Sequence, residues 1–363
     1  MNKFCYLIAT VCFLTACGKS KAPSKYNLSA LSNPDTKGFD RALSKRQFVF
    51  PQDHLPHQNF RTEWWYFTGN LMDKKSQRPF SYQLTIFRQA LKPHAITKSS
   101  LNQVWMGHLA ITDIQDHKFY SYEILEREDL ALAGFKNNPI EIFIDDWQII
   151  FRDEKFFLSA KHQDIELDLE LEALKAIALQ GDEGLSQKSA EPGNASYYYS
   201  ITRMKTDGQI KINSNKYDVS GLSWFDREWS TSALAQDQAG WDWFSLQLDN
   251  ETEIMIYQLR NKDSSIDEYS SAAIFNSGRK ILLKQKDFVI KVLRYWTSPE
   301  GLKLPAEWQI EIPSQKISLK LSPRINDQLH RFNISYWEGS VAITGSYDSK
   351  KISGYGFAEL TGY

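Results

Sequence analysis

Two carboxylates and an indole alternate in the segment SWFDREW, residues 223–229. On a β-strand the side chains of Trp224, Asp226 and Glu228 share one face. An apolar space on that face would disfavour the charged carboxylates and keep one of them protonated at neutral pH, as a general acid requires. The same pattern is expected where Arg227 pairs with a carboxylate to fix a joint between domains. Asp226 and Glu228 are therefore candidate acids, with the structural interpretation left open.

A second titratable group, Asp53, His54 and His57, lies in the segment DHLPH, residues 53–57. An acid and two imidazoles can bind a metal if a distant ligand joins them. Pro56 favours instead a turn whose imidazoles hydrogen-bond to nearby backbone or carboxylates. We favour the turn and treat these three residues as a candidate polar site, and the sequence predicts no metal and no cofactor.

Composition excludes several classes of protein. The net charge is -1, with 43 Lys plus Arg against 44 Asp plus Glu and no basic cluster, so no nucleic-acid partner is predicted. The sequence has no nucleophile elbow, P-loop, dinucleotide fingerprint or HExxH motif. Aromatic residues make up 13% of the chain, including 11 Trp, a composition that suits cores and pockets for hydrophobic small molecules.

The segment TEWWYFTGN, residues 62–70, has the alternation of a β-strand with large aromatic side chains on both faces. Glu63 and Trp65 share one face, and Trp64 lies on the other. We expect Trp65 or Trp64 to form the wall of a pocket, although core packing would also explain both indoles. Glu63 is expected to bond to an arginine or to backbone amides.

Short strand-like runs separated by turn residues follow from residue 46 onward, as is typical of sandwiches and barrels. WWYFTGNL (64–71) followed by YQLTIFR (82–88) is echoed by WDWFSLQL (241–248) followed by YQLR (257–260). This echo predicts a duplicated β-domain, with chance similarity as the alternative. We predict domains over 46–229 and 230–363, and the Gly, Ser, Asp and Pro stretch 181–194 is expected to be a loop or boundary.

The N-terminus has the features of a bacterial lipoprotein signal peptide over residues 1–16, with a short apolar run and LTAC at 14–17. Cleavage before Cys17 would expose a thiol and an amine for acylation, whereas an ordinary secretory leader is the alternative. Residues 17–45 are expected to carry the lipidated cysteine and a polar tether. Gly18 favours the outer membrane, so the predicted location is the bacterial cell envelope, facing the periplasm.

Together these motifs resemble the AttH-like, carotenoid 1,2-hydratase-related family of bacterial secreted or lipid-anchored proteins. The motifs that carry the resemblance are EWWYFTG (63–69) with Asp53, His54 and His57 before it, YYYS (197–200), DREW (226–229), GWDWF (240–244), YWEG (336–339) and ELTGY (359–363). The resemblance implies an all-β fold of two consecutive lipocalin-like β-barrel domains, with a ligand tunnel at or near their junction.

The resemblance also implies an activity. Carotenoid hydratases add water to an isolated C=C bond of an acyclic isoprenoid without a cofactor. A carboxylic acid protonates the alkene in a dry pocket, aromatic faces hold the cation, and water captures it. By this resemblance Asp226 is the proton donor and Glu228 modulates it. The expected substrate-binding residues are Trp224, Tyr197, Tyr199, Trp65, Glu63 and Trp243.

Two classes of function remain open at this point. In the first, the protein is a lipid-anchored hydro-lyase or hydrolase-like enzyme acting on an elongated hydrophobic molecule, an isoprenoid or a lipid. In the second, it carries such a ligand without chemistry, or serves an ABC transporter, because AttH-like lipoproteins are often encoded beside transporter permeases. The expected partners are a hydrophobic small molecule, the membrane through the lipid anchor, and a transporter permease.

Overall fold

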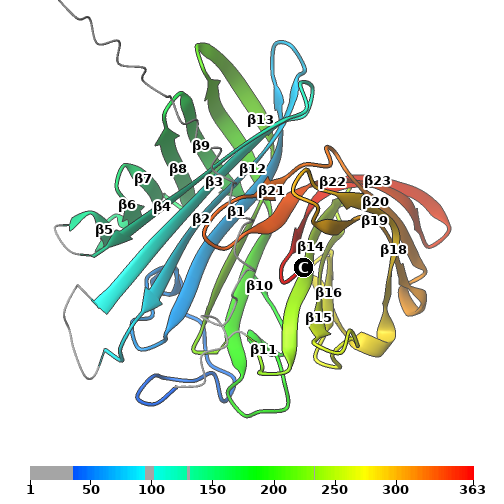
Figure 1. Cartoon of the computed structure of the whole chain (residues 1–363), viewed down its shortest axis with the longest axis horizontal. Helices are drawn as coiled ribbons and strands as arrows, with labels where there is room; N and C mark the ends of the chain where they lie inside the picture. The colour runs from blue at the N-terminus through cyan, green and yellow to red at the C-terminus, as the bar shows by residue number, and fades with distance from the viewer. Residues whose placement is uncertain (1–35, 95–101, 129–130, 233) are drawn as a thin grey trace, which may run out of the picture.

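The computed structural model describes residues 36–94, 102–128, 131–232 and 234–363, and these residues form β-strands almost throughout (Figure 1). The predicted signal peptide, Cys17 and the first part of the tether lie outside the described residues. The 3₁₀ helices Gln52–His54, Gln285–Asp287 and Pro313–Gln315 have three residues each. Within the described ranges, no helix has the length and apolar character needed to cross a membrane.

The first sheet is built from the N-terminal half of the described chain. Its strands, in spatial order, are β4 (Lys118–Arg127), β3 (Gln103–Asp113), β2 (Pro79–Ala90), β1 (Thr62–Asp73), β13 (Asn215–Ser230), β12 (Ala195–Ile212), β9 (Ile165–Ala173), β8 (Lys155–His162), β7 (Trp147–Arg152), β6 (Ile140–Ile144) and β5 (Ala133–Asn137). The short strands β10 (Ala178–Leu179) and β11 (Leu185–Gln187) pair with β12. The stretch 181–194 thus contains a short strand, and it is not a domain boundary because β12 and β13 after it return to the first sheet.

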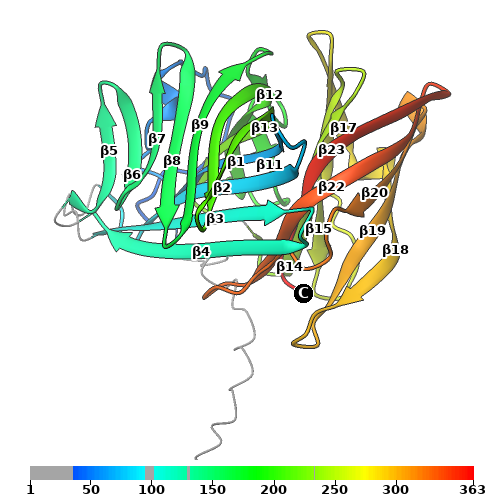
Figure 2. The same cartoon turned by 90° about the horizontal axis from the view of Figure 1, so that it is seen from above.

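The second sheet is built from the C-terminal part. Its spatial order is β17 (Arg279–Lys284), β16 (Ser271–Asn276), β15 (Glu253–Asn261), β14 (Gln238–Leu248), β23 (Lys350–Leu360), β22 (Tyr336–Tyr347), β20 (Ile317–Pro323), β19 (Lys303–Ile312) and β18 (Val289–Thr297). The two residues of β21 (Leu329–His330) pair with β22. Both sheets curve strongly and lie side by side (Figures 1 and 2). The predicted fold class, all-β with two barrel-like sheets, is confirmed.

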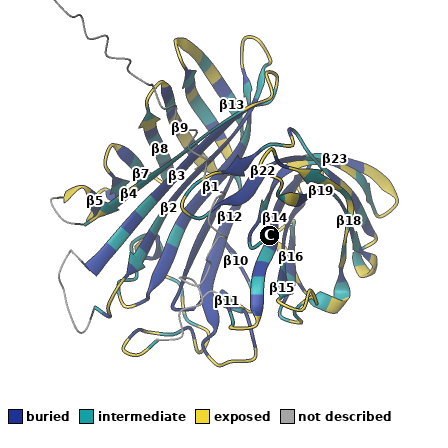
Figure 3. Ribbon diagram, viewed as in Figure 1, coloured by how far each residue is buried: buried dark blue, intermediate teal, exposed yellow. Residues whose placement is uncertain are grey.

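Buried residues run along the strands of both sheets (Figure 3), and their apolar side chains form three groups. The first fills the concave side of the first sheet and includes Trp65, Phe67 and Trp105. The second fills the second sheet around Trp308, and the third joins the two sheets. The joining group consists largely of aromatic and long apolar side chains: Tyr66, Tyr198, Trp224, Leu234, Trp243, Met255, Tyr257, Leu259 and Phe357. Each such side chain contributes about 1.5–3 kcal/mol when fully buried, so the junction between the sheets is itself a stabilising core.

Candidate active site between the two sheets

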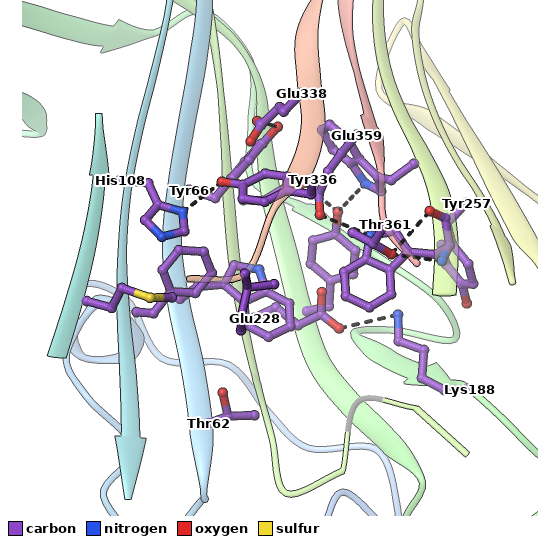
Figure 4. A pocket seen from close by; sticks show the side chains of 18 of the residues that line it. Thr62, Tyr66, His108, Lys188, Glu228, Tyr257, Tyr336, Glu338, Glu359 and Thr361 are labelled. Carbon is purple, nitrogen blue, oxygen red and sulfur yellow. Dashed lines mark hydrogen bonds and ion pairs between the residues drawn. The ribbon is translucent and has the colours of Figure 1, made fainter. Parts of the chain in front are cut away.

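A cavity of about 160 Å³ lies where the outer face of the first sheet meets the second sheet (Figure 4). Both sheets contribute to its wall, and aromatic residues are the largest group in it. The aromatic residues of this wall include Trp64, Tyr66, Tyr198, Trp241, Trp243 and Tyr336. An apolar cavity of about 150 Å³ is large enough for a benzene-sized group. The space therefore suits one end of an elongated apolar molecule.

The alternation of β1 decides which of its two adjacent tryptophans faces this cavity. Trp64 and Tyr66 line the cavity, whereas Trp65 packs in the first core, where its ring is 6.0 Å from that of Trp105. Glu63 shares the face of Trp65 and is buried on the far side of the sheet from the cavity. The sequence assigned Trp65 and Glu63 to substrate binding, and the structure does not bring them to this cavity.

Glu63 bonds to arginines and to a backbone amide, as the sequence suggested, but it does so inside the first sheet and away from the cavity. Its carboxylate accepts hydrogen bonds from Arg88, from Arg227 and from the backbone N–H of His57. Burial alone would raise the pKa of Glu63, but the two guanidinium groups hold it well below its ordinary value. The Arg88–Glu63–Arg227 cluster is thus a buried ion network inside the first sheet.

The pairing of β12 with β13 decides which of three consecutive tyrosines reaches the cavity. Tyr198 lies opposite Glu228, and Ser200 lies opposite Asp226, so these four side chains share the cavity side of the sheet. The predicted ligand-binding residues Tyr197 and Tyr199 point to the opposite face and belong to the first core. Tyr198 lines the cavity instead, in the position that was predicted for Tyr197 and Tyr199.

Asp226 projects into the junction and is only 3% exposed. Its Oδ1 accepts hydrogen bonds from the indole N–H of Trp224 at 2.7 Å and from the hydroxyl of Ser200. Its Oδ2 accepts a hydrogen bond from the hydroxyl of Tyr198 at 2.6 Å. Burial raises the pKa of Asp226 to about 7, although all three donors act to lower it. The candidate acid therefore holds a proton much of the time near neutral pH.

Trp224 supports Asp226 from behind the cavity wall. It is buried in the joining core with its ring 6.5 Å from that of Trp243, and it does not line the cavity itself. Trp243, in contrast, lines the cavity as the sequence suggested, and its indole N–H donates to the Tyr198 hydroxyl at 3.3 Å.

Glu228, the second candidate, also lines the cavity and forms an ion pair with Lys188 at 3.3 Å (Figure 4). The Lys188 ammonium lies over the ring of Tyr257, 4.2 Å from its centroid. Burial would lower the pKa of Lys188, but Glu228 outweighs it and the pKa is raised. Lys188 follows β11 in a segment without strand alternation, so no sequence pattern pointed to it.

The second sheet contributes two further carboxyl groups. They belong to the motifs YWEG (336–339) and ELTGY (359–363), for which no role in the site was predicted. Glu338 on β22 and Glu359 on β23 lie directly opposite each other, and both line the cavity (Figure 4). Burial raises the pKa of Glu359 to about 8, with Glu228 and Asp226 adding to the effect. Burial and the neighbouring Glu359 raise the pKa of Glu338 well above its ordinary value. Four carboxyl groups thus line the cavity. Among the described lining residues, Lys188 is the cation that accompanies them.

Asp53, His54 and His57 lie away from the cavity, inside the first sheet. Asp53 accepts a hydrogen bond from Arg46 at 2.7 Å and contacts His57 Nε2 at 3.0 Å. His54 Nδ1 is 2.7 Å from the hydroxyl of Tyr199, and burial, followed by Arg227, lowers the pKa of His54 to about 3. These contacts tie the segment before β1 to the core. No group of three His, Cys, Asp or Glu side chains in the described chain is arranged to hold a metal.

Comparison with known proteins shows the family of this chain. A family model described as AttH-like matches residues 41–363. The chain belongs to the AttH-like family. The family resemblance drawn from the aromatic motifs is thereby confirmed. A solved structure of a putative AttH from Nitrosomonas europaea is 29% identical to this AttH-like chain, with a TM-score of 0.80, and the match covers 90% of this chain and 100% of that one.

More distant relatives of this AttH-like chain have names that state an activity. The dehydratase asqC of Emericella nidulans is 20% identical over 215 residues, 56% of this chain and 60% of the relative. The kievitone hydratase of Fusarium solani subsp. phaseoli is 20% identical over 212 residues, 55% of this chain and 58% of the relative. The matched region thus spans no more than three fifths of either curated relative. The solved kievitone hydratase of Nectria haematococca has the same fold, with 16% identity, a TM-score of 0.67 and coverage of 89% of this chain and 98% of that one.

The cavity of this AttH-like protein has the groups that acid–base chemistry requires. Buried carboxyl groups with raised pKa values can donate or accept protons near neutral pH. The faces of Tyr66 and Trp243 are suited to stabilise positive charge that develops in an apolar space. The lining residues that the structure describes include four carboxyl groups and no arginine, so an apolar ligand fits the cavity better than an anionic one.

Proposed function

We propose that this AttH-like protein is a cofactor-independent hydro-lyase that adds water to a C=C bond at one end of an elongated apolar molecule, or removes water in the reverse direction. The observation that carries the proposal is Asp226, a buried carboxyl group in an aromatic cavity whose pKa is raised to about 7. The names of the two curated relatives, a hydratase and a dehydratase, support the same reaction class.

The hydrogen bonds of Asp226 suggest which oxygen carries the proton. Oδ1 already accepts from Trp224, whose N–H cannot rotate away, and from Ser200. Among the described residues, the hydrogen-bond partner of Oδ2 is the Tyr198 hydroxyl, which can turn to accept instead of donate. The acid form of Asp226 therefore carries its proton on Oδ2.

In the proposed step, the π electrons of the C=C bond take the proton from Oδ2 and form a C–H bond. The adjacent carbon becomes a cation, which the rings of Tyr66 and Trp243 stabilise through their π faces. A water molecule forms a C–O bond to this carbon and then loses one proton to a carboxylate of the cavity. Dehydration follows the same steps in reverse order.

The lining defines the class of substrate. Four carboxyl groups face the space with a single lysine among the described lining residues, so the buried end of the ligand is neutral or becomes cationic during reaction. A volume of about 160 Å³ admits a branched five-carbon or ring-sized end group while the rest of the molecule stays outside. An acyclic isoprenoid fits this description.

The sequence features of the N-terminus add a location to this proposal. A lipid anchor at Cys17 would hold the protein in the bacterial cell envelope, on the outer membrane facing the periplasm, where an apolar ligand can be taken from the bilayer. A transporter permease as a partner remains a prediction from the family resemblance.

The decisive test uses the full mature chain with a panel of acyclic isoprenoids, followed by mass spectrometry for addition of one water. We expect turnover by the wild type, and a loss of about 10²–10⁴-fold in Asp226→Asn. The matched control is Asp168→Asn, which changes an exposed aspartate on β9 and should leave turnover unchanged. A retained apolar ligand bound equally by wild type and Asp226→Asn, without turnover of any substrate, would favour the non-catalytic carrier.

A further inference from the structure

Hydration also needs an acceptor for the proton that water loses when it captures the cation. The ionised Asp226 can take that proton back only if water attacks from the same side of the ligand, and Glu228 is paired with Lys188 on the side of the first sheet. The second sheet supplies Glu338 and Glu359, which lie directly opposite each other on β22 and β23 and face the same cavity.

Glu338 has an incomplete set of partners. The hydroxyl of Tyr66 donates to its Oε1, and the side chain of Tyr336 lies close enough to lower the pKa of the carboxyl group. Its Oε2 has no hydrogen-bond partner in the described part of the chain, and the residue is only 2% exposed. The nearest cationic candidate is His330, whose Nε2 is 3.9 Å away, and burial lowers the pKa of His330 well below its ordinary value. A buried carboxylate oxygen without a partner is costly, so Oε2 is satisfied by a proton or by a hydroxyl group in the cavity.

Glu359 completes the pair from the neighbouring strand. Its Oε1 accepts a hydrogen bond from the indole N–H of Trp241 at 3.2 Å. Two carboxyl groups side by side on adjacent strands repel each other when both are ionised. Near neutral pH such a pair holds its protons tightly, and Glu359, whose pKa is about 8, ionises in a fraction of molecules that grows as pH rises and can then accept a proton.

A path of neighbouring polar side chains connects this pair with the protein surface. Tyr336, which contacts Glu338, has its hydroxyl 2.7 Å from Nδ1 of His108. Nε2 of His108 is 3.3 Å from Oε2 of Glu123, on β4. Glu123 in turn lines a surface groove beside Asn333, whose side-chain amide donates to it at 2.6 Å. An imidazole can take a proton at one ring nitrogen and release one at the other, so the path is continuous from groove to cavity.

We propose that Glu338 and Glu359 form the second proton-transfer group of the cavity, and that Tyr336, His108 and Glu123 connect this group with solvent. The inference rests on the proposed hydro-lyase function. In the forward direction Asp226 loses one proton to carbon, and the oxonium formed by the added water gives one proton to the ionised member of the pair. The cycle closes when the pair releases one proton to solvent along this path and Asp226 takes one proton up from solvent after the product has left the cavity. No oxidant, reductant or cofactor is required.

The two proton-transfer groups come from different sheets. Asp226 belongs to β13 of the first sheet, and Glu359 belongs to β23 of the second. A C=C group held between the sheets can therefore meet an acid from one sheet and an acceptor for the proton of water from the other. The titratable and charged groups that face the pair are Tyr66, His108, Lys188, Asp226, Glu228, His330 and Tyr336.

The first test needs no substrate. Infrared spectra of the ligand-free full chain, recorded from about pH 6 to about pH 9, report the C=O stretch of protonated carboxyl groups. We expect Glu359→Gln to remove one titrating band while Glu172→Gln, which changes an exposed glutamate on β9, removes none. An unchanged titration in Glu359→Gln would overturn the inference. Glu338→Gln is the second variant, should Glu359→Gln not fold.

The second test uses turnover. We expect Glu359→Gln to lower kcat by about 10²-fold, within the range for loss of a general base. Glu123→Gln, which alters only the outer end of the path, should increase the solvent deuterium isotope effect on kcat and shift the pH–rate profile. If Glu359→Gln turned over at the wild-type rate while Asp226→Asn was inactive, the role of the pair as second proton-transfer group would be refuted. The hydro-lyase proposal would then still hold. Equal turnover by Asp226→Asn and wild type would refute the hydro-lyase proposal. The infrared result would still report whether Glu359 titrates, because it is measured without substrate.

Discussion

Asp226 and Glu359 hold matching positions in the two sheets. Asp226 on β13 lies directly opposite Tyr66 of β1, and Glu359 on β23 lies directly opposite Trp243 of β14. The rings of Tyr66 and Trp243 meet edge to face at 5.3 Å. The first strands of the two hairpins that echo each other in sequence thus contribute the rings, and the strands paired with them, β13 and β23, contribute the acids of two equivalent aromatic–acid pairs.

Stability should depend on pH through Asp226. Its pKa is about 7 in the folded protein, against about 3.9 in an unfolded chain. Between these values the folded protein holds a proton that the unfolded chain releases, so the free energy of unfolding falls by about 1.4 kcal/mol per pH unit as pH rises. Above about pH 7 this contribution is lost and the dependence levels off.

Urea unfolding of wild type and Asp226→Asn at several pH values checks this dependence. The difference between the two free energies of unfolding isolates Asp226, because the other buried groups are common to both proteins. The difference should decline from about pH 5 to about pH 7 and then stay constant. Parallel curves over that range would show that Asp226 ionises normally in the folded state.

Ser200→Ala should extend activity to higher pH. The Ser200 hydroxyl donates to Oδ1 of Asp226 and so favours the ionised form. Its removal raises the pKa of Asp226 further, and the protonated, active form persists to higher pH. The measurement is the alkaline limb of the kcat–pH profile, and a limb that moved to lower pH would be inconsistent with Asp226 as the acid.

Trp243→Leu should reduce kcat more than ligand affinity. Leucine retains apolar contact but lacks the π face, whose contribution to a desolvated cation is about 1–2 kcal/mol, or roughly tenfold in rate. The control is Trp308→Leu, in the core of the second sheet, which should lower stability and leave the kinetics of the folded protein unchanged. Equal losses in affinity and kcat/KM with constant kcat would mean that Trp243 only binds the ground state.

Glu63→Gln should destabilise the fold without affecting the ligand. The substitution leaves Arg88 and Arg227 without their shared carboxylate inside the first sheet, which costs about 3–5 kcal/mol. Glu170→Gln, which breaks a surface pair with Lys155, should cost less than about 1 kcal/mol. Chemical denaturation measures both values. A loss of ligand affinity in folded Glu63→Gln would restore Glu63 to the binding residues.

Local alternation predicted which side chains share a face, because the period of a strand is fixed by backbone geometry. Asp226 and Glu228 were grouped correctly in this way, and Glu63 was expected to bond to an arginine. The strand character of the chain followed from the same patterning. The echo of the hairpins predicted a duplicated β-domain, and both hairpins, β1–β2 and β14–β15, contribute residues to the wall of the cavity.

The choice of face could not be predicted in the same way. A change of one residue in strand pairing exchanges the two faces of a strand, so Tyr198 could not be distinguished from Tyr197 and Tyr199. The pairing of β12 with β13 also shifts register between Ile201 and Met204, which no local pattern reveals. The contributions of Lys188, Glu338 and Glu359 depend on how two distant segments meet, and this was not encoded in any single motif.

The account rests on a protonated Asp226 that gives its proton to a ligand carbon between the sheets. Single-turnover reaction of an acyclic isoprenoid in D₂O, with product analysis by mass spectrometry and NMR, measures that transfer directly. We expect one deuterium on the carbon next to the newly hydroxylated carbon in the wild type, and no such product with Asp226→Asn. Deuterated product formed at the wild-type rate by Asp226→Asn would contradict the account.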